Sequence, residues 1–164
     1  KKYVTPIETI DGEWYLLSTA TTQASANSNR DTNISIASGY INGTVLKPGE
    51  KFSFWSVVGK CTYDKGYKDA TVYSSGKVST GIGGGVCQVS TTVNIAAKNA
   101  GINTNARQHS LPVSYAERKD EATVSYGNVD FTFVNTTGKT IKLVMSSGEG
   151  GCTCEIWATD STTE

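Results

Sequence analysis

Short runs of alternating apolar and polar residues recur along the chain and predict a fold rich in β-strands. Residues 7–17, IETIDGEWYLL, are typical of a β-hairpin, because Asp11-Gly12 supplies a two-residue turn between apolar strands. Residues 45–55, VLKPGEKFSFW, predict two strands joined by a turn at Pro48-Gly49. The first third of the chain therefore contains several short strands.

The last third of the chain has the same character. Four strand-like runs, ATVSYG, VDFTFVN, TIKLVM and CTCEIW, begin at residues 122, 129, 140 and 152. Segments rich in glycine, asparagine and serine separate them, as turns do between antiparallel strands. This region predicts a C-terminal four-stranded meander.

One helix is predicted before the second pair of strands. Ile34, Ala37 and Ile41 follow at helical spacing, and Gly43 marks the end of the helix. The polar segment before them offers three residues that can cap the helix: Ser28, Asn29 and Asp31.

The segment from Cys87 to Gly101 fits two patterns. Apolar or β-branched residues occupy every second position from Cys87 to Ile95, as on one face of a strand. β-branched residues also favour strands. Its apolar residues also recur at helical spacing, and its length of fifteen residues favours a helix that ends at Gly101. We therefore predict an α+β fold, mainly an antiparallel sheet, with two helices, one of which begins near Cys87.

Composition narrows the function classes. The 164 residues include fifteen basic and fifteen acidic side chains, so the net charge is zero, and no basic stripe suggests a nucleic-acid surface. No apolar run reaches the roughly 20 residues of a membrane helix, and we expect no membrane contact from this domain. No signal peptide is recognisable, and because the chain starts at Lys1 without Met, we expect it to be a fragment of a larger protein.

Four cysteines are present, but their spacing does not match a zinc site. Cys152 and Cys154 form a C-x-C pair whose side chains share one face of a predicted strand. We expect them to be buried thiols or one of them to form a disulfide with Cys61, and we expect no metal and no cofactor.

Cys87 follows three consecutive glycines and lies in the first turn of the predicted helix. Unpaired amides and the helix dipole favour a thiolate there. Gly84 and Gly85 allow the backbone to turn toward a developing oxyanion, with the amides of Cys87 and Gln88 as donors. The alternative is a surface turn followed by a cysteine that only packs.

A nucleophilic thiol needs a base, and His109 is the one histidine of the sequence. It lies in an extended run that follows the helix, so an adjacent strand can return it to the helix start. The alternative is a histidine with a structural role.

Four long motifs extend this interpretation: NGTVLKPGEKFSFWSVVG, GIGGGVCQVSTT, HSLPVSY and ATVSYGNVDFTF. Together they resemble the VanW domain, over residues 17–157. The resemblance implies a domain at 17–158, preceded by a lead-in hairpin at 1–16 and followed by the start of a linker at 159–164. It also implies an extracellular location, on the cell-wall face of the membrane, in a surface protein of a Gram-positive bacterium.

Some VanW domains are cysteine L,D-transpeptidases that form 3-3 cross-links in peptidoglycan. The resemblance places the family's cysteine at Cys87 and its histidine at His109. The family often has an aspartate directly before the AT of ATVSYG, where this chain has Glu121. Cys61 stands where the family usually has a basic or polar residue. The first departure leaves the third catalytic residue open.

The resemblance implies that Cys87 attacks a donor stem peptide and that His109 takes its proton. Asp130 is our first choice to orient the imidazole, because it interrupts an apolar strand pattern; a solvent-facing role is the alternative. For substrate binding we single out Arg107, Ser110 and Tyr126. Arg107 is the expected partner of a stem carboxylate, unless it is simply solvated.

Two other functions remain open. A cysteine peptidase or amidase acting on peptidoglycan stems would use the same thioester with water as the acceptor. A non-catalytic wall-binding module would leave Cys87 inert. The expected partners are peptidoglycan stem peptides in all three cases, and the sequence says nothing about the oligomeric state.

Overall fold

The computed structural model describes residues 8–9, 12–74 and 76–160. Its main sheet pairs strands from opposite ends of the chain, in the order β3-β11-β10-β4. These strands are antiparallel and comprise β3 (Tyr15–Gln23), β4 (Val45–Leu46), β10 (Thr140–Gly148) and β11 (Gly151–Thr159). The central pair, β10 and β11, forms a hairpin that is buried along most of its length.

The remaining strands of the described residues form smaller sheets. A three-stranded sheet has the order β5-β9-β8, with β5 at Lys51–Ser53, β8 at Thr104–Asn105 and β9 at Thr132–Val134. A separate hairpin pairs β6 (Asp69–Ser74) with β7 (Lys77–Ile82). Near the N-terminus, β1 (Glu8–Thr9) pairs with β2 (Gly12–Glu13).

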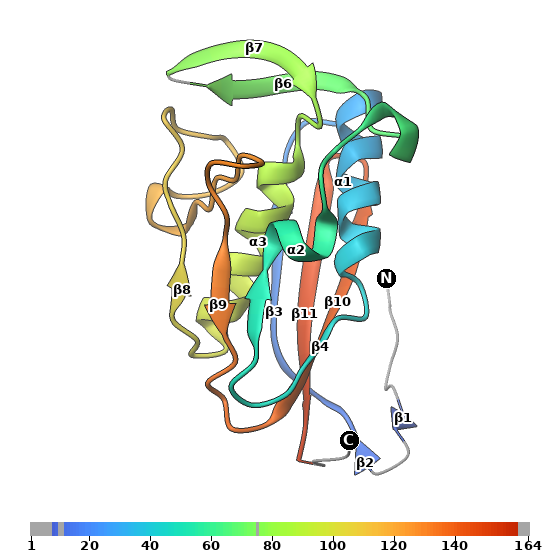
Figure 1. Cartoon of the computed structure of the whole chain (residues 1–164), viewed down its shortest axis with the longest axis vertical. Helices are drawn as coiled ribbons and strands as arrows, with labels where there is room; N and C mark the ends of the chain where they lie inside the picture. Colours follow the sequence, from blue (N-terminus) through green and yellow to red (C-terminus); the bar gives the residue numbers. More distant parts are fainter. Residues whose placement is uncertain (1–7, 10–11, 75, 161–164) are drawn as a thin grey trace.

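The described residues contain three α-helices: α1 (Ser28–Ile41), α2 (Phe54–Val58) and α3 (Val86–Asn99). Helix α1 packs on β10, and α3 packs on β3 and β11. Both helices begin at the end of the molecule where the β6–β7 hairpin lies (Figure 1). Two 3₁₀ turns occur at Tyr63–Lys65 and Arg118–Asp120.

Helix α3 is buried on nearly all sides, which explains its mixed sequence pattern. Its apolar residues, including Val89 and Val93, belong to the main core, while the polar side chains of Ser90, Thr91 and Thr92 are equally buried. The core also contains Phe52 and Phe133 from the three-stranded sheet. Their rings are stacked, with the ring centres 5.1 Å apart. Burial of such side chains contributes roughly 1.5–3 kcal/mol each.

The predicted α+β class, the antiparallel sheets and the helices at 34–41 and 87–99 are confirmed. The cap of α1 is different: the side chain of Asn27, and not of Ser28, Asn29 or Asp31, accepts the Arg30 amide at 2.9 Å. The short helix α2 was not predicted. It covers a phenylalanine and tryptophan that the alternation pattern assigned to a strand.

The predicted C-terminal meander is wrong in its first half. Residues 122–127 contain a single bridge, Ser125 with Val129, and no strand. Strand β9 pairs with β5 and β8 and not with β10. The physical reason is that the backbone groups of Ala122 and Val124 hydrogen-bond to side chains of α3 instead of to a neighbouring strand.

Two other turn predictions are partly confirmed. The N-terminal hairpin exists, but Gly12 lies in β2, and residues 10–11 are outside the described residues. Gly49 has a φ of +86°, as the Pro48-Gly49 turn requires. That turn, however, connects strands of two different sheets. Of the predicted linker at 159–164, residues 161–164 lie outside the described residues. Its first residue, Thr159, is the last residue of β11.

Candidate active site

The glycine run before Cys87 is explained by close packing. A Cβ atom on Gly84 would lie 2.4 Å from the carbonyl oxygen of Thr71 in β6, and one on Gly85 would lie 2.8 Å from Cγ of Arg30. Gly85 is also the N-cap residue of α3 and has a φ of +107°. The glycines therefore allow the start of α3 to approach both β6 and α1.

The thiol of Cys87 is held against the segment that follows residue 121. Its sulfur lies 3.5 Å from both the amide nitrogen and the carbonyl oxygen of Val124, and 3.6 Å from Oγ1 of Thr123. This segment is fixed to α3 by side chains one turn further on. Ser90 donates to the Ala122 carbonyl, and Thr91 accepts from the Ala122 amide at 3.0 Å. Ser90 and Thr91 thus position the groups that surround the thiol.

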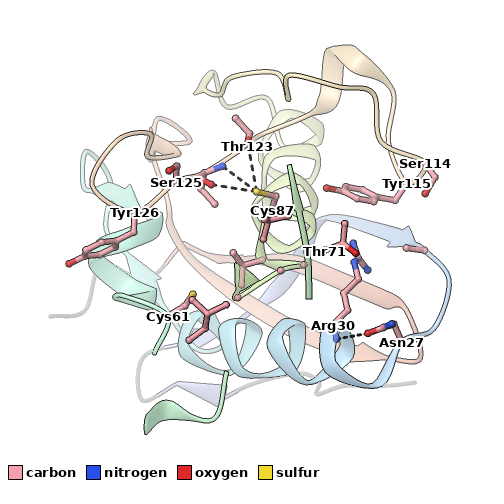
Figure 2. A pocket seen from close by; sticks show the side chains of 18 of the residues that line it. Asn27, Arg30, Cys61, Thr71, Cys87, Ser114, Tyr115, Thr123, Ser125 and Tyr126 are labelled. Carbon is pink, nitrogen blue, oxygen red and sulfur yellow. Dashed lines mark hydrogen bonds between the residues drawn. The ribbon is translucent and has the colours of Figure 1, made fainter. Parts of the chain in front are cut away.

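Cys87 opens into a cavity of about 650 Å³. Its walls come from several separate parts of the chain: the segment 24–27 with Arg30, the residues around Cys61, strands β6 and β7, the glycine run, and the segments 114–115 and 123–126. Figure 2 shows Cys87 between Tyr126 on one side of the cavity and Arg30 with Tyr115 on the other. This volume is typical of a site for a small molecule or a short peptide.

The electrostatics of Cys87 differ from the prediction of a thiolate. The side chain is half-buried, and burial raises the pKa of the thiol above its ordinary value of 9.0. Hydrogen bonds with Val124 and Thr123 and the positive charge of Arg30 oppose this shift but are smaller. The resting protein therefore holds a neutral thiol near pH 7, and a reaction at Cys87 requires a base.

Gln88 does not contribute to the cavity. Its amide donates to the Gly85 carbonyl at 3.0 Å, within the turn that starts α3. Its fully buried side chain donates to Thr22 and Gly150 at the end of the main sheet. An amide that is already paired is a poor oxyanion donor, which leaves the Cys87 amide of the predicted pair.

His109 is buried, with 3% of its surface exposed. Its Nε2 lies 3.3 Å from the hydroxyl of Tyr115, which lines the cavity. Among the described residues the sulfur of Cys87 hydrogen-bonds to Thr123 and Val124 and not to His109. Burial, together with the charge of Arg118, lowers the pKa of His109, so the imidazole is neutral at pH 7.

The carboxylate beside His109 is Glu121. Its side chain is fully buried, and Oε1 accepts the His109 amide at 2.9 Å and pairs with Arg118 at 3.4 Å. Its negative charge raises the pKa of His109 and so opposes the effect of burial. The residue at the position of the family's aspartate is therefore a neighbour of the histidine.

Asp130 lies elsewhere. Its carboxylate accepts hydrogen bonds from the hydroxyl of Ser53 and from the amides of Trp55 and Phe131, at 2.5, 3.0 and 2.9 Å. Ser53 is the N-cap of α2, so Asp130 ties the start of α2 to the strand that follows. The structure does not bring Asp130 to His109, because the carboxylate is engaged by the start of α2 and by the adjacent Phe131 amide.

The three predicted substrate-binding residues have different surroundings. Tyr126 lines the cavity, is 52% exposed, and packs edge-on against Trp55 at 5.3 Å. Arg107 and Ser110 are exposed and do not line the cavity. Arg107 accepts the Thr123 amide through its carbonyl, and the Ser110 hydroxyl accepts the Gly76 amide.

Sequence reasoning missed Arg30 as a cavity residue. It lies in α1, far along the chain from Cys87, and no local pattern links the two. Thr123 and Tyr115 were missed as contacts of Cys87 and His109, although both lie in the quoted motifs. Their position inside conspicuous motifs was the available signal.

All four cysteines are free, so the disulfide expected for Cys61 is absent. Cys152 and Cys154 are buried on one face of β11, as the C-x-C spacing predicted, and β11 keeps them away from Cys61, which lines the cavity. Within the described residues, no group of three or more metal-binding side chains occurs. No helix among them has the length and apolarity to cross a membrane.

The comparisons with known proteins identify the family. The family model for "VanW like protein" matches residues 29–157, most of the chain. The chain belongs to the VanW family. The match includes nearly all of α1, the glycine run, α3 and the segments around His109 and Cys87, and so contains the cavity walls other than segment 24–27.

Two curated relatives are similar to this chain. The uncharacterized protein YoaR of Bacillus subtilis (strain 168) is 41% identical over 128 residues, which are 77% of this chain and 42% of the relative. The vancomycin B-type resistance protein VanW of Enterococcus faecalis (strain ATCC 700802 / V583) is 31% identical over 140 residues, 80% of this chain and 45% of the relative. The chain thus spans less than half the length of either relative. No solved structure matches the chain.

Proposed function

We propose that this domain is a peptidoglycan L,D-transpeptidase that forms 3-3 cross-links through a thioester on Cys87. The observation that carries the proposal is the half-buried thiol at the start of α3, which opens into a cavity of about 650 Å³. A free thiol that lines a cavity and contacts three polar groups supports a chemical role for Cys87 over a packing role. The VanW relative, named for resistance to vancomycin, supports a cell-wall context.

The first step of the proposed reaction forms the thioester. The Cys87 thiol loses its proton to His109, and the sulfur attacks the carbonyl carbon at the L-centre of diaminopimelate in the donor stem. The amide bond to D-Ala breaks, and the leaving nitrogen takes up the proton. The unpaired Cys87 amide is the donor for the developing oxyanion.

The second step forms the cross-link. The side-chain amine of diaminopimelate in a neighbouring stem attacks the thioester, an amide bond forms, and the sulfur regains a proton. His109 accepts the proton of the amine and returns it to the sulfur. A neutral imidazole suits this role, because only the neutral form accepts a proton.

In the resting protein, the Cys87 thiol and the His109 imidazole have other hydrogen-bond partners than the proposed reaction requires. The thiol is bonded to Val124 and Thr123, and Nε2 of His109 is bonded to the Tyr115 hydroxyl. Catalytic hydrogen bonds often form only when substrate is bound, so the resting arrangement is compatible with a base at His109. Tyr115 links the buried imidazole to the cavity. Glu121 accepts the backbone amide of His109 and so fixes the backbone at the base, while its negative charge acts on the imidazole.

The test is to incubate the domain with purified disaccharide-tetrapeptides and to analyse the products by mass spectrometry. Cross-linked dimers that require Cys87 support the proposal. Trimmed monomers without dimers would show that water resolves the thioester and that the domain is a hydrolase. No change under any condition would favour a wall-binding module. The Cys87→Ala variant is the control, and an unchanged melting temperature shows that it is folded.

The location and partners follow from the same proposal. We propose that the domain acts outside the cell, on the cell-wall face of the membrane, as part of a larger surface protein. Its partners in this proposal are peptidoglycan stem peptides.

A further inference from the structure

Arg30 places a cationic side chain in the cavity, and one of its guanidinium nitrogens makes no hydrogen bond within the described residues. It lines the same cavity as Cys87, and its Nη1 is buried without a hydrogen bond. Within the described residues the guanidinium has no ion pair, although four other cations do. A buried guanidinium nitrogen without a hydrogen bond is costly, so this donor is available to an anionic group of a molecule that enters the cavity.

The surroundings fix the position of Arg30. Its backbone amide is capped by Asn27, which sets it in the first turn of α1. Its stem passes Gly85, where a Cβ would lie 2.8 Å from Cγ. Its guanidinium carbon lies 5.6 Å from the centre of the Tyr115 ring. Helix α1, the glycine run and Tyr115 therefore hold the side chain in the cavity.

Arg30 also acts on the thiol through its charge. It is the one cation whose field lowers the pKa of Cys87, which places it within electrostatic range of the sulfur. Figure 2 shows its side chain rising from α1 toward Tyr115, across the cavity from Tyr126. A molecule that reaches the sulfur can therefore also reach the guanidinium.

We propose that Arg30 binds a carboxylate of the molecule that reacts at Cys87 and is a specificity-determining residue of this site. The guanidinium presents two parallel N–H groups that match a carboxylate, whereas a lysine presents a point charge. The identification of that molecule as a donor stem rests on the proposed function. Two carboxylates of a stem are suitable: that of the terminal D-Ala and that of the diaminopimelate side chain.

The first experiment requires no enzymatic activity. Cys87 is alkylated with iodoacetate and with iodoacetamide, which differ mainly in the carboxylate, and the modified peptide is quantified by mass spectrometry. The ratio of the two rates cancels any effect of Arg30 on the thiol pKa. Arg30→Gln is compared with Arg30→Lys and with Lys51→Gln, which removes an exposed charge from β5 outside the cavity.

We expect Arg30→Gln to lower the iodoacetate-to-iodoacetamide ratio at Cys87 roughly tenfold or more, since a hydrogen bond to a charged group is worth about that factor. Arg30→Lys should lower it less, and Lys51→Gln should leave it unchanged. A ratio that stays the same in folded Arg30→Gln and Arg30→Lys overturns the inference, whatever the domain catalyses. Melting temperatures establish that the variants are folded.

The second experiment identifies the carboxylate. The wild type and Arg30→Gln are compared on tetrapeptide stems in which the D-Ala carboxylate, the diaminopimelate carboxylate, both or neither is converted to an amide. A loss of kcat/KM that disappears when one particular group is amidated assigns Arg30 to that group. An equal loss on all four stems overturns the inference. If the wild type forms no product from any stem, the proposed function fails, and the alkylation ratio alone decides the role of Arg30.

Discussion

The amide nitrogen and the carbonyl oxygen of Val124 both lie 3.5 Å from the sulfur of Cys87. A thiol can donate to the carbonyl, and a thiolate can accept from the amide, so one residue contacts both protonation states. The burial that accompanies this contact outweighs it and raises the pKa of the thiol. The resting site therefore keeps its sulfur protonated until a base acts.

The first prediction concerns the pH dependence of that thiol. Alkylation of Cys87 by iodoacetamide should be slow at pH 7 and should accelerate with a midpoint above 9.0, because burial raises the pKa of Cys87. The rates are measured by peptide mass spectrometry in the wild type and in Cys61→Ser, which removes the second thiol of the cavity. A midpoint well below 9.0 in both proteins would contradict the role of burial.

The second prediction concerns the contact between the glycine run and β6. Gly84→Ala should destabilise the fold by about 1–3 kcal/mol, the usual cost of overpacking, because the new methyl group meets the Thr71 carbonyl. Gly148→Ala in β10 is the matched control, since a Cβ there meets nothing within 4 Å. Urea unfolding measures both. Equal stabilities of the two variants would show that the glycine run is not required by packing.

The third prediction assigns Asp130 to the fold. Asp130→Ala should lower the free energy of unfolding by about 1.5–3 kcal/mol, because two donors at the start of α2 and the Phe131 amide lose a charged acceptor. The exposed Asp64→Ala in the first 3₁₀ turn is the control. The NMR titration of His109 should be the same in both variants. A shifted His109 titration in folded Asp130→Ala would instead support an orienting role.

The sequence predicted the elements whose signal is local. The spacing of Ile34, Ala37 and Ile41 predicted α1, and the length of the segment after Cys87 predicted α3, although β-branched residues favour strands. The buried environment of α3 outweighs that preference, because its valines complete the core while its threonines find partners in neighbouring segments. Tertiary packing thus decided the ambiguous case.

The site could be predicted only in part, because its residues come from distant segments. Cys87 and the glycine run were visible in one motif. Arg30 comes from another helix, and its role depends on a contact with Tyr115 that no spacing reveals. Residues 122–127 were misassigned to a strand, and the bonds of Asp130 at α2 were not foreseen, because alternation along one strand does not show which hydrogen-bond partners the fold supplies.

The fourth prediction concerns the charge beside the histidine. Glu121→Gln should lower the pKa of His109 further, because the negative charge of Glu121 raises it and burial then acts with less opposition. The single imidazole of the sequence gives one clear NMR titration. Glu117→Gln is the control: it removes an exposed carboxylate that pairs with Lys119. An unchanged titration in folded Glu121→Gln would remove Glu121 from the set of residues that tune the base.

The last prediction follows from the lowered pKa of His109. The unfolded chain binds a proton at its ordinary value of 6.5, whereas the folded protein binds it only at lower pH. In this range the unfolded state holds more protons, so the free energy of unfolding falls as pH falls from 6.5 through the folded pKa. His109→Gln removes this dependence while it keeps a polar side chain.

The stability difference between the wild type and His109→Gln should therefore be larger at pH 8 than at pH 5, as measured by urea unfolding at both values. The same variant should lose roughly 10²–10⁴-fold in turnover at pH 7, the usual contribution of a general base. A structural histidine gives the first result without the second, because turnover then falls only with the folded fraction. Near-wild-type turnover in folded His109→Gln would separate His109 from the chemistry of Cys87 and leave the thiol in need of another base.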